Sequence, residues 1–167
     1  MKRAFGMMAL AFAIFVLVGC GAGAGAGATP EETRTNMLAA IDSGDGAAFA
    51  NCFKADEGAK EMIASMCRAG AVATRFLEKM ETAYGKGAGA DYAGTAEVTK
   101  ELKQSLSNTT IKVDGDKATL TISGENDKIL MVKIGGVWVV DEPAMATAPR
   151  GYKAQVAQAD ALTQSME

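Results

Sequence analysis

The residues that could do chemistry in this chain are few, because it holds three cysteines and no histidine. Histidine is the commonest general base and the commonest metal ligand in proteins. Its absence excludes Ser-His-Asp and Cys-His nucleophile systems and every histidine-ligated zinc site. Carboxylates and tyrosines are then the only candidates for a general base. Those in or beside predicted loops are Tyr84, Asp91, Tyr92 and Tyr152.

The length and charge of the chain narrow the function classes further. Its 167 residues predict a single domain, and a formal net charge of −3 provides no basic field to hold nucleic acid. The glycine-rich stretch 85–94 lacks the Gly-Lys-Ser/Thr ending of a phosphate-binding loop. Asp114-Gly115-Asp116 lacks the later ligands of a calcium loop. We therefore expect no cofactor, no metal and no nucleic-acid partner.

The N-terminus has the pattern of a targeting segment. Residues 1–3 are positively charged, and residues 4–18 form an uncharged apolar run that is short for a membrane span of about 20 residues. The run ends in Leu17-Val18-Gly19-Cys20, which resembles the lipobox of bacterial lipoproteins. The alternatives are an ordinary secretory signal with a chance cysteine, or an uncleaved anchor.

The lipobox resemblance implies cleavage before Cys20 and attachment of a diacylglyceryl group to its sulfur, with a further acyl group on the new N-terminus. Two or three acyl chains hold a protein stably on a bilayer, whereas one holds it only marginally. The protein is then expected in the cell envelope, facing the periplasm or the cell surface. Gly21, where aspartate would favour retention at the inner membrane, weakly favours the outer membrane of a two-membrane bacterium.

Residues 21–28 read GAGAGAGA, with no side chain larger than a methyl group. A flexible linker of this length spans about 16 Å on average and less than about 29 Å when fully stretched. It is interpreted either as a spacer that lifts the domain off the membrane or as a repeat of no selected length. In both interpretations we expect it to lie outside the fold. The predicted organisation is a signal peptide at 1–19, a lipidated cysteine with its tether at 20–28, and one domain at 29–167.

Helical periodicity dominates the first part of that domain. Thr29-Pro30-Glu31-Glu32 has the form of a capping box with proline at the first helical position. Apolar residues at three- and four-residue steps then predict a helix up to residue 43, a short helix around Phe49, a long helix that ends near Tyr84, and a fourth over about 96–106. A weaker pattern over 152–166 predicts a closing helix.

The period changes after residue 108, where alternating residues predict strands. The predicted strands cover 109–113, 117–123, Lys128–Ile134 and Val137–Val140, with turns at Asp114-Gly115-Asp116 and Gly135-Gly136. Helices followed by an antiparallel meander of about four strands define an α+β fold.

Three segments carry a resemblance to the nuclear transport factor 2-like superfamily, most of all to its small bacterial lipoproteins of unknown function. They are Ile41-Asp42-Ser43-Gly44-Asp45, the strand pair at 113–120, and the strand pair at 132–140. The resemblance implies a curved sheet wrapped around a helix to form a cone that holds a small molecule. Trp138 is expected to fill the core or to line that cone. Phe76 and Met80, on the apolar face of the long helix, are the other candidate lining residues.

Cys52 and Cys67 are left as an even pair once Cys20 is assigned to lipid. Thiol pairs form disulfides in oxidising compartments, and closing this loop would stabilise the domain by about 3 kcal/mol in the chain-entropy model. In a simple helical hairpin the two cysteines are offset by roughly 10 Å, beyond the reach of a disulfide, so the helices would have to cross. We predict the disulfide, with two buried structural thiols as the alternative.

These patterns favour a membrane-anchored envelope lipoprotein with a non-catalytic domain that binds a small apolar ligand or another envelope protein. One alternative is an isomerase- or dehydratase-like enzyme, since the superfamily includes enzymes that use an aspartate base with a tyrosine donor. Another alternative is a structural spacer of the envelope.

Overall fold

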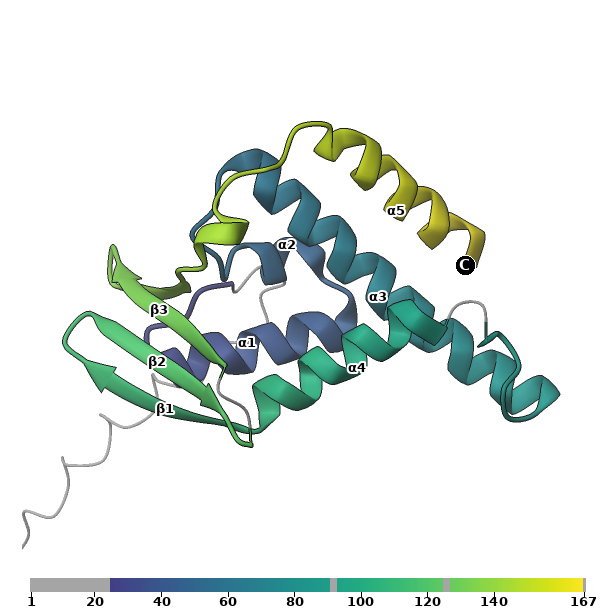
Figure 1. Ribbon diagram of the computed structural model, residues 1–167, viewed down its shortest axis with the longest axis horizontal. Coiled ribbons are helices and arrows are strands. Elements are labelled where there is room, and N and C mark those ends of the chain that lie inside the picture. The colour runs from purple at the N-terminus through teal and green to yellow at the C-terminus, as the bar shows by residue number, and fades with distance from the viewer. Residues whose placement is uncertain (1–24, 91–92, 125–126, 167) are drawn as a thin grey trace, which may run out of the picture.

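The computed structural model describes residues 25–90, 93–124 and 127–166. Four helices come first, a four-stranded antiparallel sheet follows, and a last helix closes the chain (Figure 1). The predicted α+β class is confirmed. The elements are α1 (Pro30–Ser43), α2 (Gly46–Ala50), α3 (Glu57–Tyr84), α4 (Ala93–Ser107), β1 (Thr109–Asp114), β2 (Lys117–Ile122), β3 (Lys128–Ile134), β4 (Val137–Val140), a short 3-10 helix (Pro143–Met145) and α5 (Tyr152–Met166).

Local chemistry explains where the helices begin and end. Thr29 caps α1 by accepting a hydrogen bond from the backbone N–H of Glu32, and Gly44 ends the helix in the left-handed region at φ 76°. The side chain of Asp56 caps α3 in the same way by accepting from the N–H of Ala59 at 2.7 Å. Gly44 and Asp56 therefore end α1 and begin α3 on either side of α2.

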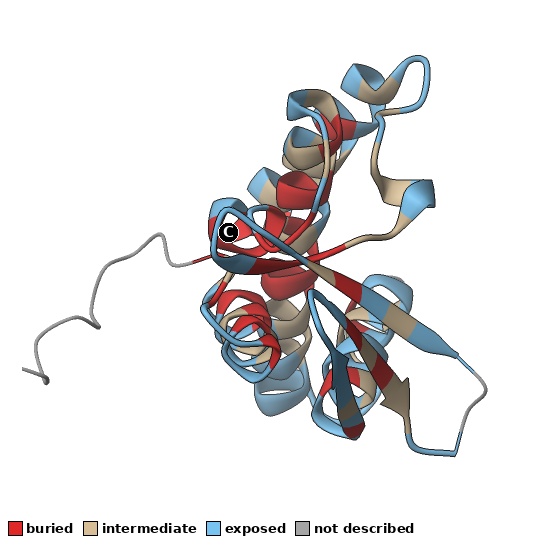
Figure 2. Ribbon diagram, turned by 90° about the vertical axis from the view of Figure 1, so that its left-hand side faces the viewer, coloured by how far each residue is buried: buried red, intermediate tan, exposed pale blue. Residues whose placement is uncertain are grey.

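The sheet is a meander in the order β1-β2-β3-β4. Its register places Ala118 opposite Met131, and Met131 opposite Val140, so these side chains share one face. That face is buried, whereas much of β1 and the opposite face are exposed (Figure 2). The two predicted hairpin turns use Gly115 at φ 60° and the Gly135-Gly136 pair, also at positive φ.

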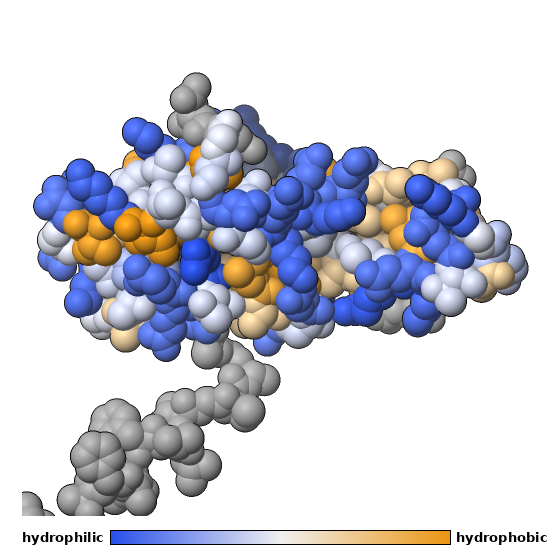
Figure 3. Space-filling model, turned by 90° about the horizontal axis from the view of Figure 1, so that it is seen from below, coloured by the Kyte–Doolittle hydropathy of each residue, from blue (hydrophilic) through white to orange (hydrophobic). Residues whose placement is uncertain are grey.

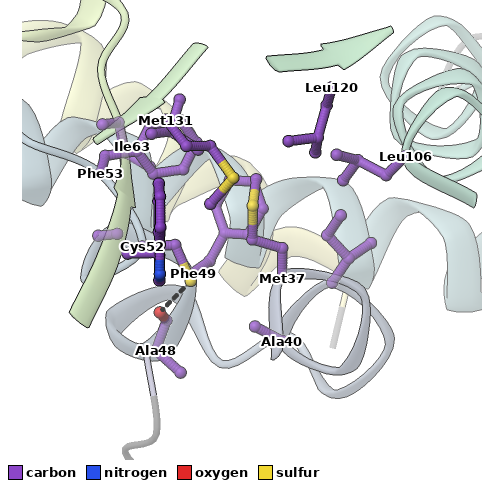
Figure 4. Close-up of a cluster of buried hydrophobic side chains, with 14 of the residues drawn as sticks. Met37, Ala40, Ala48, Phe49, Cys52, Phe53, Ile63, Leu106, Leu120 and Met131 are labelled. Atoms are coloured by element: carbon purple, nitrogen blue, oxygen red, sulfur yellow. Dashed lines mark hydrogen bonds between the residues drawn. The ribbon is translucent and has the colours of Figure 1, made fainter. Parts of the chain in front are cut away.

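The main core lies between the buried face of the sheet and helices α1, α2 and the first turns of α3 (Figure 4). Leu120 and Met131 from the sheet meet Met37 from α1 and Phe49 from α2 there. A second, smaller cluster holds the far half of α3 against α4 and α5. Its buried members are Val72, Ala73, Ala96 and Met166, with Phe76, Leu77 and Leu162 packed against them.

The prediction that the whole glycine-alanine segment lies outside the fold is wrong for residues 25–28. Gly27 forms an antiparallel bridge with Trp138 on the outer edge of β4, and both Gly25 and Gly27 are buried. A segment of glycine and alanine has no side chain larger than a methyl group to bury. Its backbone can still pair with the edge of a sheet, and its glycines let that backbone approach the domain closely.

Candidate functional site

An open apolar groove lies on α3 between α4 and α5. Both helices pack against α3, on either side of it in Figure 1. α4 comes close because Gly70 carries no side chain: a Cβ there would overlap Thr99 Oγ1. α5 is held by Asp160, which accepts from Ser65 Oγ at 2.8 Å and pairs with Arg68 Nη2 at 3.2 Å. α4 and α5 form the two walls of the groove. Each contacts α3, and the space between them is open.

The groove has a volume of about 450 Å³. Met66 and Ala69 of α3 form its floor. Met66 is 59% exposed and Val98 of α4 is 65% exposed, so two large apolar side chains face solvent on the lining of one groove. The remaining lining residues are small, apolar or uncharged polar: Gly94, Thr95, Thr99, Gln155, Gln158, Ala159 and Leu162.

The chemistry of the groove suits binding of apolar surface. Threonine and glutamine side chains at its edges can donate and accept hydrogen bonds without placing a charge in it. The nearby Asp160 carboxylate is already engaged, and its hydrogen bonds from Ser65 and then Arg68 lower its pKa. An aspartate held in this way remains ionised at neutral pH and is a poor proton acceptor.

The sheet does not enclose a cone, because its inner face is filled by the core. Trp138 is 4% exposed and lies in the main cluster, which confirms the core interpretation of this residue. Phe76 belongs to the second cluster, and Met80 is half-buried farther along α3 beside Gly89. The structure therefore does not bring Trp138, Phe76 and Met80 together as the lining of one pocket.

The candidate general bases are also separated. Tyr84 is 77% exposed at the end of α3, whereas the ring of Tyr152 lies against Gly58 at its start. α3 spans roughly 40 Å, so these two tyrosines cannot share a site. Partial burial and a hydrogen bond with Glu61 raise the pKa of Tyr152. Asp91 and Tyr92 lie outside the described residues, as does Cys20.

The two remaining cysteines are free thiols in the structure, so the predicted disulfide is not formed. Each sulfur has a different partner: Cys52 Sγ donates to Ala48 O at 3.4 Å (Figure 4), and Cys67 Sγ donates to Ala40 O at 3.8 Å. Burial raises the pKa of Cys52 to about 12 and that of Cys67 to about 11. The structure matches the alternative of two structural thiols rather than a bridge.

These thiols should be almost unreactive in the folded protein, because the thiolate is the nucleophile and both pKa values lie far above neutrality. At about pH 8 we expect Ellman's reagent to modify neither within the time it takes to titrate both in urea. Since the folded pKa values exceed the ordinary value of 9.0, the stability that the protonated thiols contribute is complete below about pH 9. It is lost as the pH rises through 11 to 12.

A comparison of urea midpoints at about pH 8 and pH 10.5 for wild type and Cys52→Ala checks this sign. The wild-type protein should lose more stability between the two pH values than the variant does. Rapid labelling of the folded protein, or an equal loss in both proteins, would show that the thiols are not held protonated.

Met66 and Val98 are the groove residues that the sequence alone does not single out. Both have the spacing of an apolar helical face, which normally becomes core. No sequence signal shows which part of such a face remains uncovered, because that depends on how far apart α4 and α5 sit on α3.

Seen from below, apolar surface occurs in separate patches divided by hydrophilic residues, and one patch lies over the sheet end (Figure 3). Exposed apolar side chains of the strands include Val113, Leu130 and Ile134. Within the described residues, no three acidic or cysteine side chains gather in a way that could hold a metal ion. No helix in that same part of the chain is long and apolar enough to cross a membrane.

Comparisons with known proteins give no assignment: no family model, no curated protein and no solved structure matches this chain.

Proposed function

We propose that this protein is a membrane-anchored lipoprotein of the bacterial envelope whose domain binds the apolar face of an amphipathic helix of another envelope protein. The binding site is the groove on α3 between α4 and α5. The observation that carries this proposal is the exposure of Met66 and Val98, at 59% and 65%, on the lining of one groove. Methionine is flexible and polarizable, and is common at surfaces that accept varied apolar partners.

A helix fits this groove better than a compact ligand does. Small-molecule pockets bury most of the ligand surface, whereas this groove is open to solvent between two helices. An amphipathic helix laid between α4 and α5 would cover Met66 and Val98 and leave its polar face in solvent. The uncharged rim of Thr95, Thr99, Gln155 and Gln158 can accept such a helix without burying a charge.

A small apolar ligand is the second candidate, and the volume of the groove favours it. About 450 Å³ lies within the usual range of roughly 300–1,000 Å³ for ligand sites. The site then differs from the one implied by the superfamily resemblance, since it lies on the helices and not in the curve of the sheet. In either case we propose a non-catalytic domain.

We also propose the relationship to the nuclear transport factor 2-like superfamily and the lipid anchor on Cys20. The helices-first order and the four-stranded meander support the first of these. The second is supported by Leu17-Val18-Gly19-Cys20 after an apolar run and a charged start. Removal of residues 1–19 leaves 15 basic against 20 acidic residues, so the acyl chains rather than surface charge would hold the domain at an anionic bilayer.

Photo-crosslinking in cells tests the binding proposal. A photoreactive amino acid replaces Val98 in one variant and Lys100 in the control, which is exposed on the same helix but does not line the groove. We expect an adduct with an envelope protein from position 98, captured through an amphipathic helical segment, and none from position 100. Adding Met66→Glu should weaken the adduct at least about tenfold, because it places a charge on the groove floor.

Three other outcomes of the crosslinking experiment would contradict a protein partner in the groove. An adduct of lipid mass at position 98 would favour the small apolar ligand. Equal adducts at positions 98 and 100 would show unspecific contact, and the absence of any adduct at position 98 would contradict the proposal.

A further inference from the structure

The end of the glycine-alanine segment is seated on the domain by a chain of hydrogen bonds. Gly27 O accepts from Trp138 N at 2.8 Å, and Gly27 N donates to Thr33 Oγ1 at 2.8 Å. Thr33, which is fully buried, donates in turn to Trp138 O at 2.9 Å. The Asn36 amide donates to Gly25 O at 2.9 Å. The segment, residues 25–28, is thus docked on the outer edge of β4 through a single antiparallel bridge at Gly27.

The two-residue period of the repeat matches the burial of the docked segment, since Gly25 and Gly27 are both buried. A Cβ on Gly27 would lie 2.7 Å from Glu32 Cβ, and one on Gly25 would overlap Asn51 Cβ, so neither position has room for a side chain. Ala28 is exposed and Ala26 half-buried. The alternation places glycine where the domain is close and alanine where it is not.

We propose that this docked segment presents the sheet end of the domain to the membrane and points the groove away from it. The proposal rests on the lipid anchor at Cys20 proposed above. Because the segment is docked from Gly25 onward, only five residue steps, at most about 18 Å of chain, separate Cys20 from the docked part of the fold. The predicted tether to Thr29 would allow nearly twice that distance. The face that meets the lipid headgroups is therefore the outer edge of β4 and the start of α1.

The position of the groove follows from the direction of α1. Its first turn lies beside Gly27 and Trp138, and its last residues lie beside α3 and α4, where Ser43 contacts Arg75 and Asp42 pairs with Lys103. A 14-residue helix spans about 21 Å, so α1 holds the groove-bearing half of the molecule that much farther from the attachment point. Figure 1 shows the sheet at one end of the molecule and the far half of α3 at the other. The groove would then face partners in the aqueous compartment.

Docking can be tested on the soluble domain, residues 21–167, without any lipid. Gly27→Val adds a side chain where none fits, and Ala28→Val adds one at the neighbouring exposed position. Thr33→Val removes the bridging hydroxyl while keeping the shape of the side chain. We expect Gly27→Val and Thr33→Val to expose residues 25–28 to a glycine-tolerant protease at least about tenfold faster and to shift the fluorescence of Trp138 to the red. Ala28→Val should behave as wild type.

Orientation is then measured with the lipidated protein in vesicles that contain dansyl-labelled lipid. Trp138 is the single tryptophan, so energy transfer to the labelled lipid reports its distance from the membrane. Wild type and Ala28→Val should show strong transfer, and Gly27→Val clearly weaker transfer because its free tether is longer. Equal transfer in all three would overturn the orientation. Equal protease rates in the soluble domain would overturn docking itself. Failure of the protein to enter vesicles would contradict the lipid anchor and leave the docking result intact.

Discussion

Gly46→Ala should destabilise the domain by about 3 kcal/mol, a large share of the roughly 5–15 kcal/mol that holds a typical domain folded. Gly46 begins α2 and is buried against α3, where a Cβ would overlap the backbone carbonyl and the Cα of Ala64. Backbone atoms in the middle of a helix cannot rotate aside as a side chain can. The added methyl group therefore forces α2 away from α3 and withdraws Phe49 and Cys52 from the main core. Urea unfolding followed by Trp138 fluorescence measures the loss.

Gly94→Ala is the matched control for this substitution. Gly94 lies in α4, and apart from the adjoining backbone of that helix nothing lies within 4 Å of the position that an added methyl group would take, so alanine should be neutral or slightly stabilising there. An unchanged urea midpoint for Gly46→Ala would mean that α2 can move off α3 at little cost. That result would contradict the packing that places Phe49 between α3 and the sheet.

Cys20→Ser should abolish lipid modification of the protein. A serine hydroxyl cannot form the thioether that holds the diacylglyceryl group, and processing before residue 20 depends on that modification in lipoproteins. We expect complete loss of incorporated alkyne-palmitate and accumulation of a precursor that is longer by the 19 residues of the predicted signal peptide. Metabolic labelling followed by mass spectrometry of the N-terminal peptide measures both changes.

Cys67→Ser provides the control for Cys20→Ser, since it makes the same exchange inside the domain and should leave labelling unchanged. An unmodified Cys20 in the mature wild-type protein would contradict the anchor. Equal labelling of wild type and Cys20→Ser would contradict it as well.

Most of the elements could be predicted from the sequence because each depends on local signals. Thr29 and Gly44 bound α1 as a cap and a left-handed stop, and Gly135-Gly136 joins β3 to β4 as a tight hairpin. Period-two alternation in β2 puts Ala118 and Leu120 on one face of the strand, and both are buried. The α+β class follows from the order of these elements.

The free state of the two thiols and the position of the groove could not be predicted in the same way, because both depend on how separate helices meet. The Cys52 thiol donates a hydrogen bond to Ala48 O in α2, whereas the Cys67 thiol donates to Ala40 O in α1. Val98 has the spacing of a core residue, and only the separation of α4 from α5 leaves it in solvent. The docking of the glycine-alanine segment at residues 25–28 could not be predicted for a related reason. Its backbone rather than any side chain makes the contact with Trp138, and composition alone carries no sign of that partner.

The proposed function requires the groove to be occupied in the cell, and oxidative footprinting of methionine tests this directly. Met66 forms the groove floor, whereas Met145 packs against the main core, outside the groove, and serves as the internal control. Sulfoxide formation at both residues is compared between the protein in native membranes and the purified domain. We predict several-fold slower oxidation of Met66 in the membranes, with Met145 unchanged. Equal oxidation of Met66 in both samples would contradict the proposed function.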